Sequence, residues 1–544
     1  MTTLPIDRRS LFRAGAVGLA ALSVPAFAAE SGFTHGVASG EPDSHRVLLW
    51  TRYVGNGEAK LGWEISDSEN FAKVIASGDA VASSEKDWCA KAWAEGLAPG
   101  KWYFYRFVAP SGAVSPVGRT RTLPIGKVPS FKLAVFSCSN FGFGWFNAYA
   151  HAVEAGDFDL SVHLGDYFYE YKRGEYPSTR QANPDRPLPL VEAITLAGYR
   201  ERYATYRADP DLQRLHARAP MIAMWDDHET ANDTWKLGAE NHDPATEGDW
   251  QVRKAASERA WREWMPVSDD YWASYEIGQL ATLFRLETRH LARDEQFDLV
   301  AMQRGKPPAD VEGVLQRFKQ QQWHDPKRTL MGTEQERWLA AQLKASTRAR
   351  KPWQVLGQQV VMGKLVLPEI ATQNLPTTMS GGLRERLLAL GNAARSEVPL
   401  NMDAWDGYPA ARERLYTSAL NANANLLVLS GDSHNAWAFD HAHGQGRQMH
   451  RVGAEFGVTS VTSPGAEGNL PWIKPADFAK ATVERNQTLK WCDTAQRGYL
   501  ALDLTPTQAA GEWRFLQTVR QKSTALSGIK RMTVLAGQRQ FTRS

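Results

Sequence analysis

Short apolar runs that end in polar clusters are the most regular pattern in this sequence. Each run has the length of a buried strand, and longer stretches that favour helices separate the runs. Strands that alternate with helices predict an α/β domain, which we expect to extend from residue 130 to residue 544. The apolar runs are residues 131–136, 160–164, 221–225 and 426–430. The expected helices are residues 145–154, 196–206, 251–264, 334–346 and 408–424.

One of these helices carries a specific start signal. Thr333 followed by Glu336 has the spacing of a capping box, in which each side chain bonds a backbone N–H of the first turn. We therefore expect the helix at residues 334–346 to begin with Thr333 as its cap.

The preceding region, residues 32–125, has a different rhythm. Short strand-like runs at residues 46–51, 60–65 and 102–107 are separated by turn signals rich in Gly, Pro and Asp. This pattern predicts an N-terminal all-β sandwich domain. Its residues indicate a spacer or cover and give no sign of a binding function.

The first residues have the pattern of an export signal. Arg8 and Arg9 form a twin-arginine start, residues 14–22 are apolar, and residues 26–28 form a small-x-small cleavage site. We expect residues 1–28 to be a Tat signal peptide, removed near Ala28; the alternative is a buried N-terminal helix. The prediction implies the Tat export machinery as a partner and a periplasmic or extracellular location. No later stretch reaches the length of a transmembrane span.

Composition narrows the function classes. Hydrophobic residues make up 43% of the chain and charged residues 23%, which is typical of a globular protein. The formal net charge is +3, and removing the signal brings the chain closer to neutrality, so no specific nucleic-acid binding is expected.

The chain has three cysteines, Cys89, Cys138 and Cys492. Because this number is odd, at least one thiol is unpaired. The twin-arginine route carries folded proteins, which fits a metal inserted before export.

The polar clusters after the four apolar runs point to a metal site. In α/β folds the carboxyl ends of strands form one rim where ligands bind, so distant segments converge there. Carboxylates suit hard cations, whereas phenolate and thiolate favour a metal such as iron, and one carboxylate can bridge two ions. Each cluster alone is equally consistent with a turn or with core packing. Four clusters with the same arrangement, each directly after an apolar run, are better explained by a metal site. Their candidate ligands are Cys138, Asp166, Tyr169, Asp227, His228, Asp432 and His434.

The same clusters carry a family resemblance. Residues 136–139 (Phe-Ser-Cys-Ser), 163–171 (His-Leu-Gly-Asp-Tyr-Phe-Tyr-Glu-Tyr), 225–229 (Trp-Asp-Asp-His-Glu) and 430–437 (Ser-Gly-Asp-Ser-His-Asn-Ala-Trp) resemble the PhoD-type alkaline phosphatases. This family is related to the purple acid phosphatases of the calcineurin-like metallophosphatase superfamily. The resemblance extends over the whole chain. It implies an αββα sandwich behind the β-domain and a secreted phosphomonoesterase and phosphodiesterase that uses Fe(III) with Ca²⁺.

The resemblance also assigns roles to individual residues. His228 matches the residue that touches the phosphate or the leaving group. Asp227 and Asp432 match the calcium side, and Asp226 is either a further calcium ligand or a support for one. Asp166 bridges the two metals. The iron ligands implied are Cys138, Asp166, Tyr169 and His434.

Four further residues have weaker assignments. Asn140 is a candidate contact to substrate or metal, and Arg289 pairs either with phosphate or with a structural acid. Glu287 stands where the family usually has Asp, which puts a metal contact there in doubt. Gln359 either lines the cleft or satisfies buried backbone groups.

These assignments predict hydrolysis of phosphate esters by a metal-activated hydroxide, with Asp166 and His228 as the catalytic pair. His228 either protonates the leaving oxygen or holds the phosphoryl group. Two alternatives stay open. One is a phospholipase D-like or nuclease-like diesterase on the same scaffold, and the other is a secreted binding protein in which the ions only fix loops.

Overall fold

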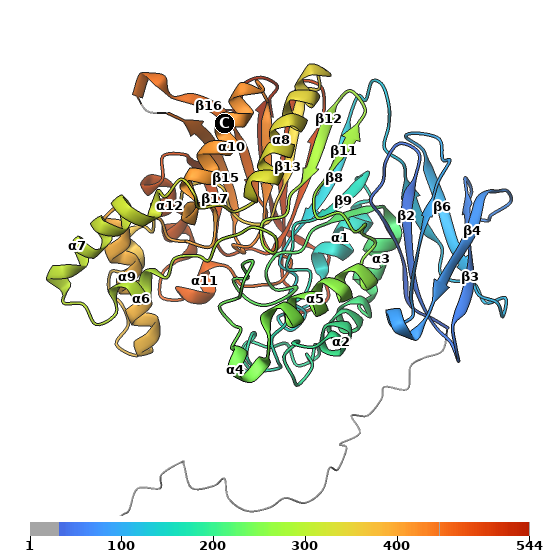
Figure 1. The fold of residues 1–544 in the computed structure, drawn as a ribbon, viewed down its shortest axis with the longest axis horizontal. Helices are drawn as coiled ribbons and strands as arrows, with labels where there is room; N and C mark the ends of the chain where they lie inside the picture. Colours follow the sequence, from blue (N-terminus) through green and yellow to red (C-terminus); the bar gives the residue numbers. More distant parts are fainter. Residues whose placement is uncertain (1–31, 445, 543–544) are drawn as a thin grey trace, which may run out of the picture.

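The structure is a computed structural model that describes residues 32–444 and 446–542. The predicted export signal at residues 1–28 lies outside these residues. Two large sheets lie face to face at the centre of the molecule (Figure 1). The nine-stranded sheet has the order β20 (Leu526–Leu535), β19 (Gln508–Leu516), β18 (Gly498–Leu504), β8 (Phe131–Phe136), β9 (Leu160–His163), β10 (Met221–Ala223), β1 (Gly32–Gly40), β2 (Val47–Val54) and β5 (Cys89–Ala94).

The seven-stranded sheet supplies the second central layer. Its strands β12, β13, β14 and β16 pair in parallel, so the carboxyl ends of these four strands share one edge. In the nine-stranded sheet, β8, β9 and β10 also pair in parallel, so their carboxyl ends share one edge. The order of the second sheet is β11 (Ala273–Ile277), β12 (Ala281–Arg285), β13 (Trp353–Gly357), β14 (Leu426–Ser430), β16 (His450–Gly457), β15 (Ala436–His443) and β17 (Leu489–Asp493).

Alternation along the strands explains why helices cover both outer faces. In β8, Leu133 and Val135 face the seven-stranded sheet, whereas Ala134 and Phe136 face the helices on the other side. Strands that are buried on both faces have continuous apolar runs. The result is the expected αββα arrangement. The nine-stranded sheet is covered by α1 (Asn147–Ala155), α2 (Leu196–Arg207), α3 (Pro210–Arg218) and α5 (Trp250–Trp264), and the other sheet by α8 (Gly332–Arg348) and α10 (Pro409–Asn421).

The five predicted helices are present, with ends that differ by a few residues, but the predicted capping box is wrong. The helix α8 begins at Gly332, its cap position is Met331, and no side chain caps it. The backbone N–H of Gly332 instead bonds the Thr329 hydroxyl. The helix therefore begins before Thr333, at the turn formed by Thr329, and Thr333 cannot act as its cap.

The predicted N-terminal sandwich is present, and strands β1, β2 and β5 of this sandwich are part of the nine-stranded sheet. Its outer sheet packs against β1, β2 and β5 through a shared apolar core. The strand β1 also pairs in parallel with β10, with Gly40 opposite Met221. Hydrogen bonding thus runs without a break from the sandwich into the α/β region. The outer sheet is β4 (Val74–Ala82), β3 (Ala59–Ser66), β6 (Trp102–Val108) and β7 (Gly118–Arg121).

A small group of helices lies at the far end of the molecule from the sandwich (Figure 1). It contains α6 (Leu299–Gln303), α7 (Pro308–Phe318), the π-helical turn η2 (Lys319–Trp323) and α9 (Gly381–Arg395), with α11 (Ala466–Asn469) and α12 (Pro475–Arg485) beside them. The remaining short elements are α4 (Pro244–Glu247), η1 (Ser84–Lys86), η3 (Glu369–Ala371), η4 (Trp405–Gly407) and η5 (Gly446–Gln448).

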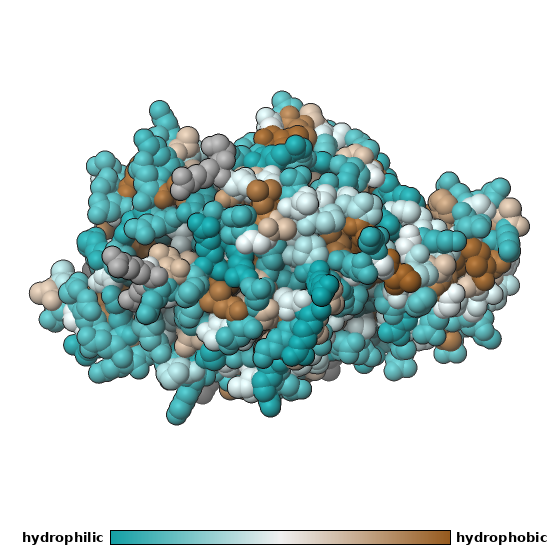
Figure 2. Space-filling view, turned by 90° about the horizontal axis from the view of Figure 1, so that it is seen from above, coloured by the Kyte–Doolittle hydropathy of each residue, from teal (hydrophilic) through white to brown (hydrophobic). Residues whose placement is uncertain are grey.

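The face of the molecule seen in Figure 2 is mostly hydrophilic, with apolar residues in small separate patches. Among the residues described, no helix has both the length and the apolar character needed to cross a bilayer. The three cysteines are buried, and each of them is a free thiol.

Candidate metal centre

The four predicted clusters meet at the carboxyl ends of β8, β9, β10 and β14. The backbone is under strain at these ends, because Cys138, Asp166, Asp432 and His434 have φ between 51° and 62°. A non-glycine residue in this region costs about 1–2 kcal/mol, and such strain persists only where the surroundings impose it. It commonly marks functional sites.

Gly165 shows why one cluster begins with glycine. Its φ is +112°, and a Cβ placed there would lie 2.4 Å from the Cβ of Asp226. The clusters after β9 and β10 can therefore approach only without a side chain at residue 165. This contact brings Asp166 beside Asp226 and Asp227.

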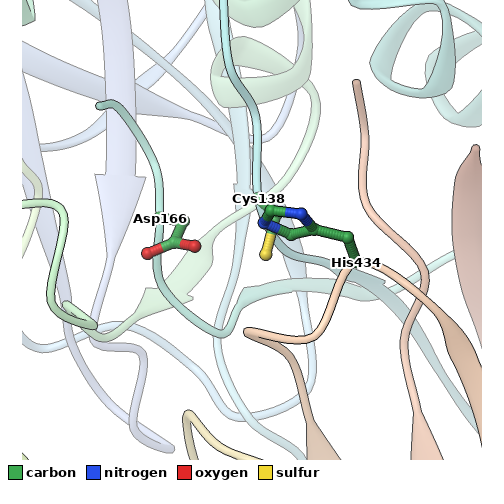
Figure 3. A group of neighbouring side chains, drawn as sticks. All are labelled: Cys138, Asp166 and His434. Atoms are coloured by element: carbon green, nitrogen blue, oxygen red, sulfur yellow. The ribbon is translucent and has the colours of Figure 1, made fainter. Parts of the chain in front are cut away.

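Three overlapping groups of donor atoms result, each with all its atoms within 4.8 Å of one another. Cys138, Asp166 and His434 form the first, and Figure 3 shows their side chains directed toward a common space. Asp166, Asp227 and His228 form the second. Asp226, Asp227 and Asp432 form the third. Asp166 belongs to two groups, as the predicted bridging ligand must.

Tyr169 extends the first group. Its phenol oxygen lies 3.1 Å from Asp166 Oδ2 and 3.0 Å from His434 Nε2. Ser463 donates a hydrogen bond of 2.9 Å to the same oxygen. All four predicted iron ligands are therefore adjacent. Ser463 was missed because it follows no apolar run and belongs to no recognised motif.

The donors fit a cation because one oxygen of each of three aspartates lacks a hydrogen bond. Asp166 Oδ1, Asp226 Oδ2 and Asp227 Oδ1 are buried and, within the described part of the chain, have no hydrogen-bond partner. A buried carboxylate oxygen without a hydrogen bond is costly, and metal coordination is one of the few ways to stabilise it. Asp226 thus remains a candidate ligand for a calcium ion.

Burial shapes the protonation of these groups. It raises the pKa of the Asp166 and Asp432 carboxyls, the Cys138 thiol and the Tyr169 phenol well above their ordinary values. It also lowers the pKa of His434 to about 4, so this imidazole is neutral and able to ligate. Anionic donors in such a place need a nearby positive charge. A metal ion supplies that charge and favours the ligating forms.

His228 is held by a carboxylate that the sequence reasoning missed. Its Nδ1 lies 2.8 Å from Glu170 Oε2, and the other oxygen of Glu170 accepts the Asn232 N–H at 2.8 Å. Burial acts to lower the pKa of His228, but Asp227, Glu170 and Asp166 outweigh it and raise the pKa. Glu170 directly follows Tyr169, and this position in the quoted motif was the signal available.

A second missed glutamate joins two of the clusters. Glu229 accepts the backbone N–H of Asp226 at 2.8 Å and that of Asp166 at 3.2 Å. Burial raises its pKa to about 8. The Glu229 side chain thereby fixes the spacing between two candidate ligands without reaching the donor groups itself.

Arg289 is buried among the aspartates of the centre and pairs with several of them. Its side chain is 0% exposed, pairs with Asp226 and Asp403, and has Nη2 3.7 Å from Asp227 and 3.6 Å from Asp432. These ion pairs correspond to the structural alternative considered for Arg289. A phosphate contact by Arg289 stays a prediction. Asp403, which also pairs with Arg293, lies in a loop that no motif marks.

The other weak candidates make local contacts. The side-chain oxygen Oδ1 of Asn140 accepts the Gly142 N–H at 3.0 Å, and a contact of Asn140 with substrate or metal stays a prediction. Glu287 accepts the N–H groups of Arg289 and His290, and it belongs to none of the donor groups found in the described residues. Gln359 donates to the carbonyls of Trp225 and Leu286, as expected of a residue that satisfies buried backbone groups.

Comparison with known proteins agrees with this geometry. Residues 133–513 match the model of the PhoD-like phosphatase family, and residues 19–124 match its N-terminal domain. Alkaline phosphatase D of Bacillus subtilis (strain 168) is 33% identical over 518 residues, which cover 91% of this chain and 79% of that protein. A solved structure described as the structure of PhoD is 31% identical, with a TM-score of 0.75, covering 94% of this chain and 92% of the other. The chain therefore belongs to the PhoD-like phosphatase family.

Proposed function

We propose that this phosphatase is exported by the twin-arginine route and hydrolyses both phosphomonoesters and phosphodiesters with Fe(III) and Ca²⁺ at the described centre. Family membership supports hydrolysis of phosphate esters. The twin-arginine pattern of residues 1–28 supports export to the periplasm or beyond. One observation carries the metal assignment: buried carboxylate oxygens without partners converge with a thiol, a phenol and two imidazoles.

The donor chemistry supports two kinds of ion. Cys138, Tyr169 and His434, with Asp166, offer the thiolate, phenolate and imidazole donors that suit Fe(III). Asp227 and Asp432, with Asp166 or Asp226, offer only oxygen donors and suit Ca²⁺. When bound, these ions supply charge neutralisation for the phosphate and lower the pKa of bound water.

The protein's own residues orient the reaction. Glu170 engages Nδ1 of His228, so Nε2 is the ring nitrogen available to the substrate. The surrounding carboxylates raise the pKa of His228, which favours a proton on that nitrogen. His228 is thus suited to donate a proton to the leaving oxygen or a hydrogen bond to the phosphoryl group. Arg289 and Glu229 hold Asp226 in position, the first by an ion pair and the second by accepting its backbone N–H.

The test is an Asp166→Asn variant produced in the same way as the wild type. We expect it to lose bound metal, measured by elemental analysis, together with turnover of para-nitrophenyl phosphate and bis(para-nitrophenyl) phosphate. Full activity in this variant rejects the scheme. If metal-loaded wild-type protein turns over neither ester, the ions serve only to fix loops, as in the binding-protein alternative.

A further inference from the structure

A cavity of about 380 Å³ opens directly beside the metal centre. Asp432 and His434, two of the candidate ligands, form part of its wall, together with Asp233. Its volume lies within the range of about 300–1,000 Å³ that small-molecule sites have. The cavity therefore borders the candidate metal centre on the side of Asp432 and His434.

The rest of the wall is largely apolar. Residues Leu365 and Leu367 follow β13, Leu387 and Leu390 lie on α9, Leu470 follows α11, and Phe478 lies on α12. Three separate parts of the chain thus supply aliphatic and aromatic side chains to one space. These residues come from helices α9 and α12 and from the loops after β13 and α11, and they follow none of the four predicted strand ends.

Few charges face the apolar part. Asp406 lines the cavity, but it pairs with Arg412 at 2.7 Å. Arg386 also lines it and is exposed to solvent. A molecule that fills this space is therefore anionic at the metal end and apolar along the remainder. A compact sugar phosphate or a nucleotide leaves the leucine side chains without a matching surface.

We infer that the cavity holds the aliphatic chain of a phosphate ester substrate, either an alkyl or an acyl-bearing alcohol group. This inference rests on the proposed phosphate-ester hydrolysis and specifies its substrate class. With the phosphate at the centre, the ester oxygen is the only link between the phosphate and the chain. Water adds its hydroxyl to phosphorus, the bond from phosphorus to the ester oxygen breaks, and the alcohol leaves with the proton from water.

Chain length is the direct readout. Each methylene that enters the apolar cavity increases kcat/KM by about two- to fourfold until the space is filled. We expect octyl phosphate to be hydrolysed at least about 20-fold more efficiently than ethyl phosphate, because the ethyl group has fewer methylenes to bury in the cavity. All substrates are used below their micelle-forming concentrations, so that aggregation does not imitate the effect.

Two substitutions on one helix provide a matched pair. Leu387 lines the cavity and is 6% exposed, whereas its neighbour Leu388 is 48% exposed and is not part of the cavity wall. Leu387→Gln places an amide in the apolar space and lowers the octyl-to-ethyl ratio by about tenfold. Leu388→Gln leaves the ratio unchanged. Leu470→Gln repeats the test from a different element in case Leu387→Gln unfolds, which a thermal melt detects.

Inhibitors give a measurement that does not depend on turnover. Octylphosphonate, which is not hydrolysed, should inhibit wild-type turnover of ethyl phosphate more strongly than ethylphosphonate does, and Leu387→Gln should remove most of that difference. A second arm compares octyl phosphate with monomeric dihexanoyl phosphatidylcholine. Preference for the first indicates a free alkyl phosphate as the source of the chain, and preference for the second indicates a lipid.

The outcomes separate this inference from the proposed function. If ethyl phosphate, octyl phosphate and the lipid are all left intact by metal-loaded protein, the proposed hydrolysis itself is wrong. If the esters are hydrolysed with the same kcat/KM at every chain length, the cavity does not receive the chain. A length dependence that Leu387→Gln and Leu470→Gln both leave intact also overturns the assignment.

Discussion

Replacing Glu170 by glutamine tests how the centre controls His228. The side chain of Glu170 is fully buried and bonds His228 Nδ1 at 2.8 Å. A hydrogen bond between charged partners contributes about 1.5–3 kcal/mol. Glutamine keeps the shape but removes the negative charge. Because Glu170, together with Asp227, raises the pKa of His228, the substitution lowers this pKa.

The sign of the pH effect follows. The folded-state pKa of His228 lies above its unfolded value, so its ion pair stabilises the protein fully below pH ~6.5. That contribution is lost as the pH rises through the folded-state pKa. If protonated His228 is required for turnover, the alkaline limb of the kcat profile of Glu170→Gln moves to lower pH. We expect kcat to fall about 10- to 100-fold, with KM changed less than about threefold.

The assay is steady-state turnover of para-nitrophenyl phosphate from pH 5 to pH 10, with metal content measured on the same samples. Glu192→Gln is the control, because Glu192 is a half-buried carboxylate that pairs with Arg253 at 2.7 Å and does not contact His228. Glu170→Asp keeps the charge and should recover part of the activity. An unshifted alkaline limb in Glu170→Gln, with full metal content, refutes the role given to this glutamate.

Three further substitutions have defined outcomes. Gly165→Ala forces a Cβ to 2.4 Å from that of Asp226, and we expect a loss of about 2–4 kcal/mol in the free energy of unfolding by urea; a loss below about 0.5 kcal/mol contradicts the packing argument. Arg289→Met leaves buried carboxylates uncompensated and should cost about 3–5 kcal/mol in the same assay, unless added Ca²⁺ restores stability. Cys138→Asp should keep activity in peroxide that inactivates the wild type, because the oxidisable thiolate is gone; equal inactivation of both proteins excludes Cys138 as the target.

The four strand ends could be predicted because their signal is local. An apolar run such as residues 426–430 indicates a strand that is buried on both faces, and the polar residues that follow it indicate where the strand ends at the edge of the sheet. The packing of the two sheets against each other then brings Asp432 beside Asp227, although 205 positions separate them. The sequence could therefore predict which donor side chains gather at one place without predicting their geometry.

Residues that support the ligands could not be found in this way. Asp403 and Ser463 reach the centre from loops with no periodic pattern, and their contacts depend on where distant segments pack. The pairing of Gly40 with Met221 could not be predicted either, because no pattern near these residues indicates that a sandwich strand joins the nine-stranded sheet. The apolar cavity likewise depends on the packing of α9 and α12 beside the centre, which composition does not reveal.

The most direct measurement is anomalous X-ray scattering from crystals of active protein, collected on both sides of the iron absorption edge. We expect an iron peak bonded to Cys138, Tyr169 and His434, and a separate peak with oxygen ligands from Asp227 and Asp432. Asp166 should contact both. Fully active crystals with no ion at these side chains would contradict this expectation.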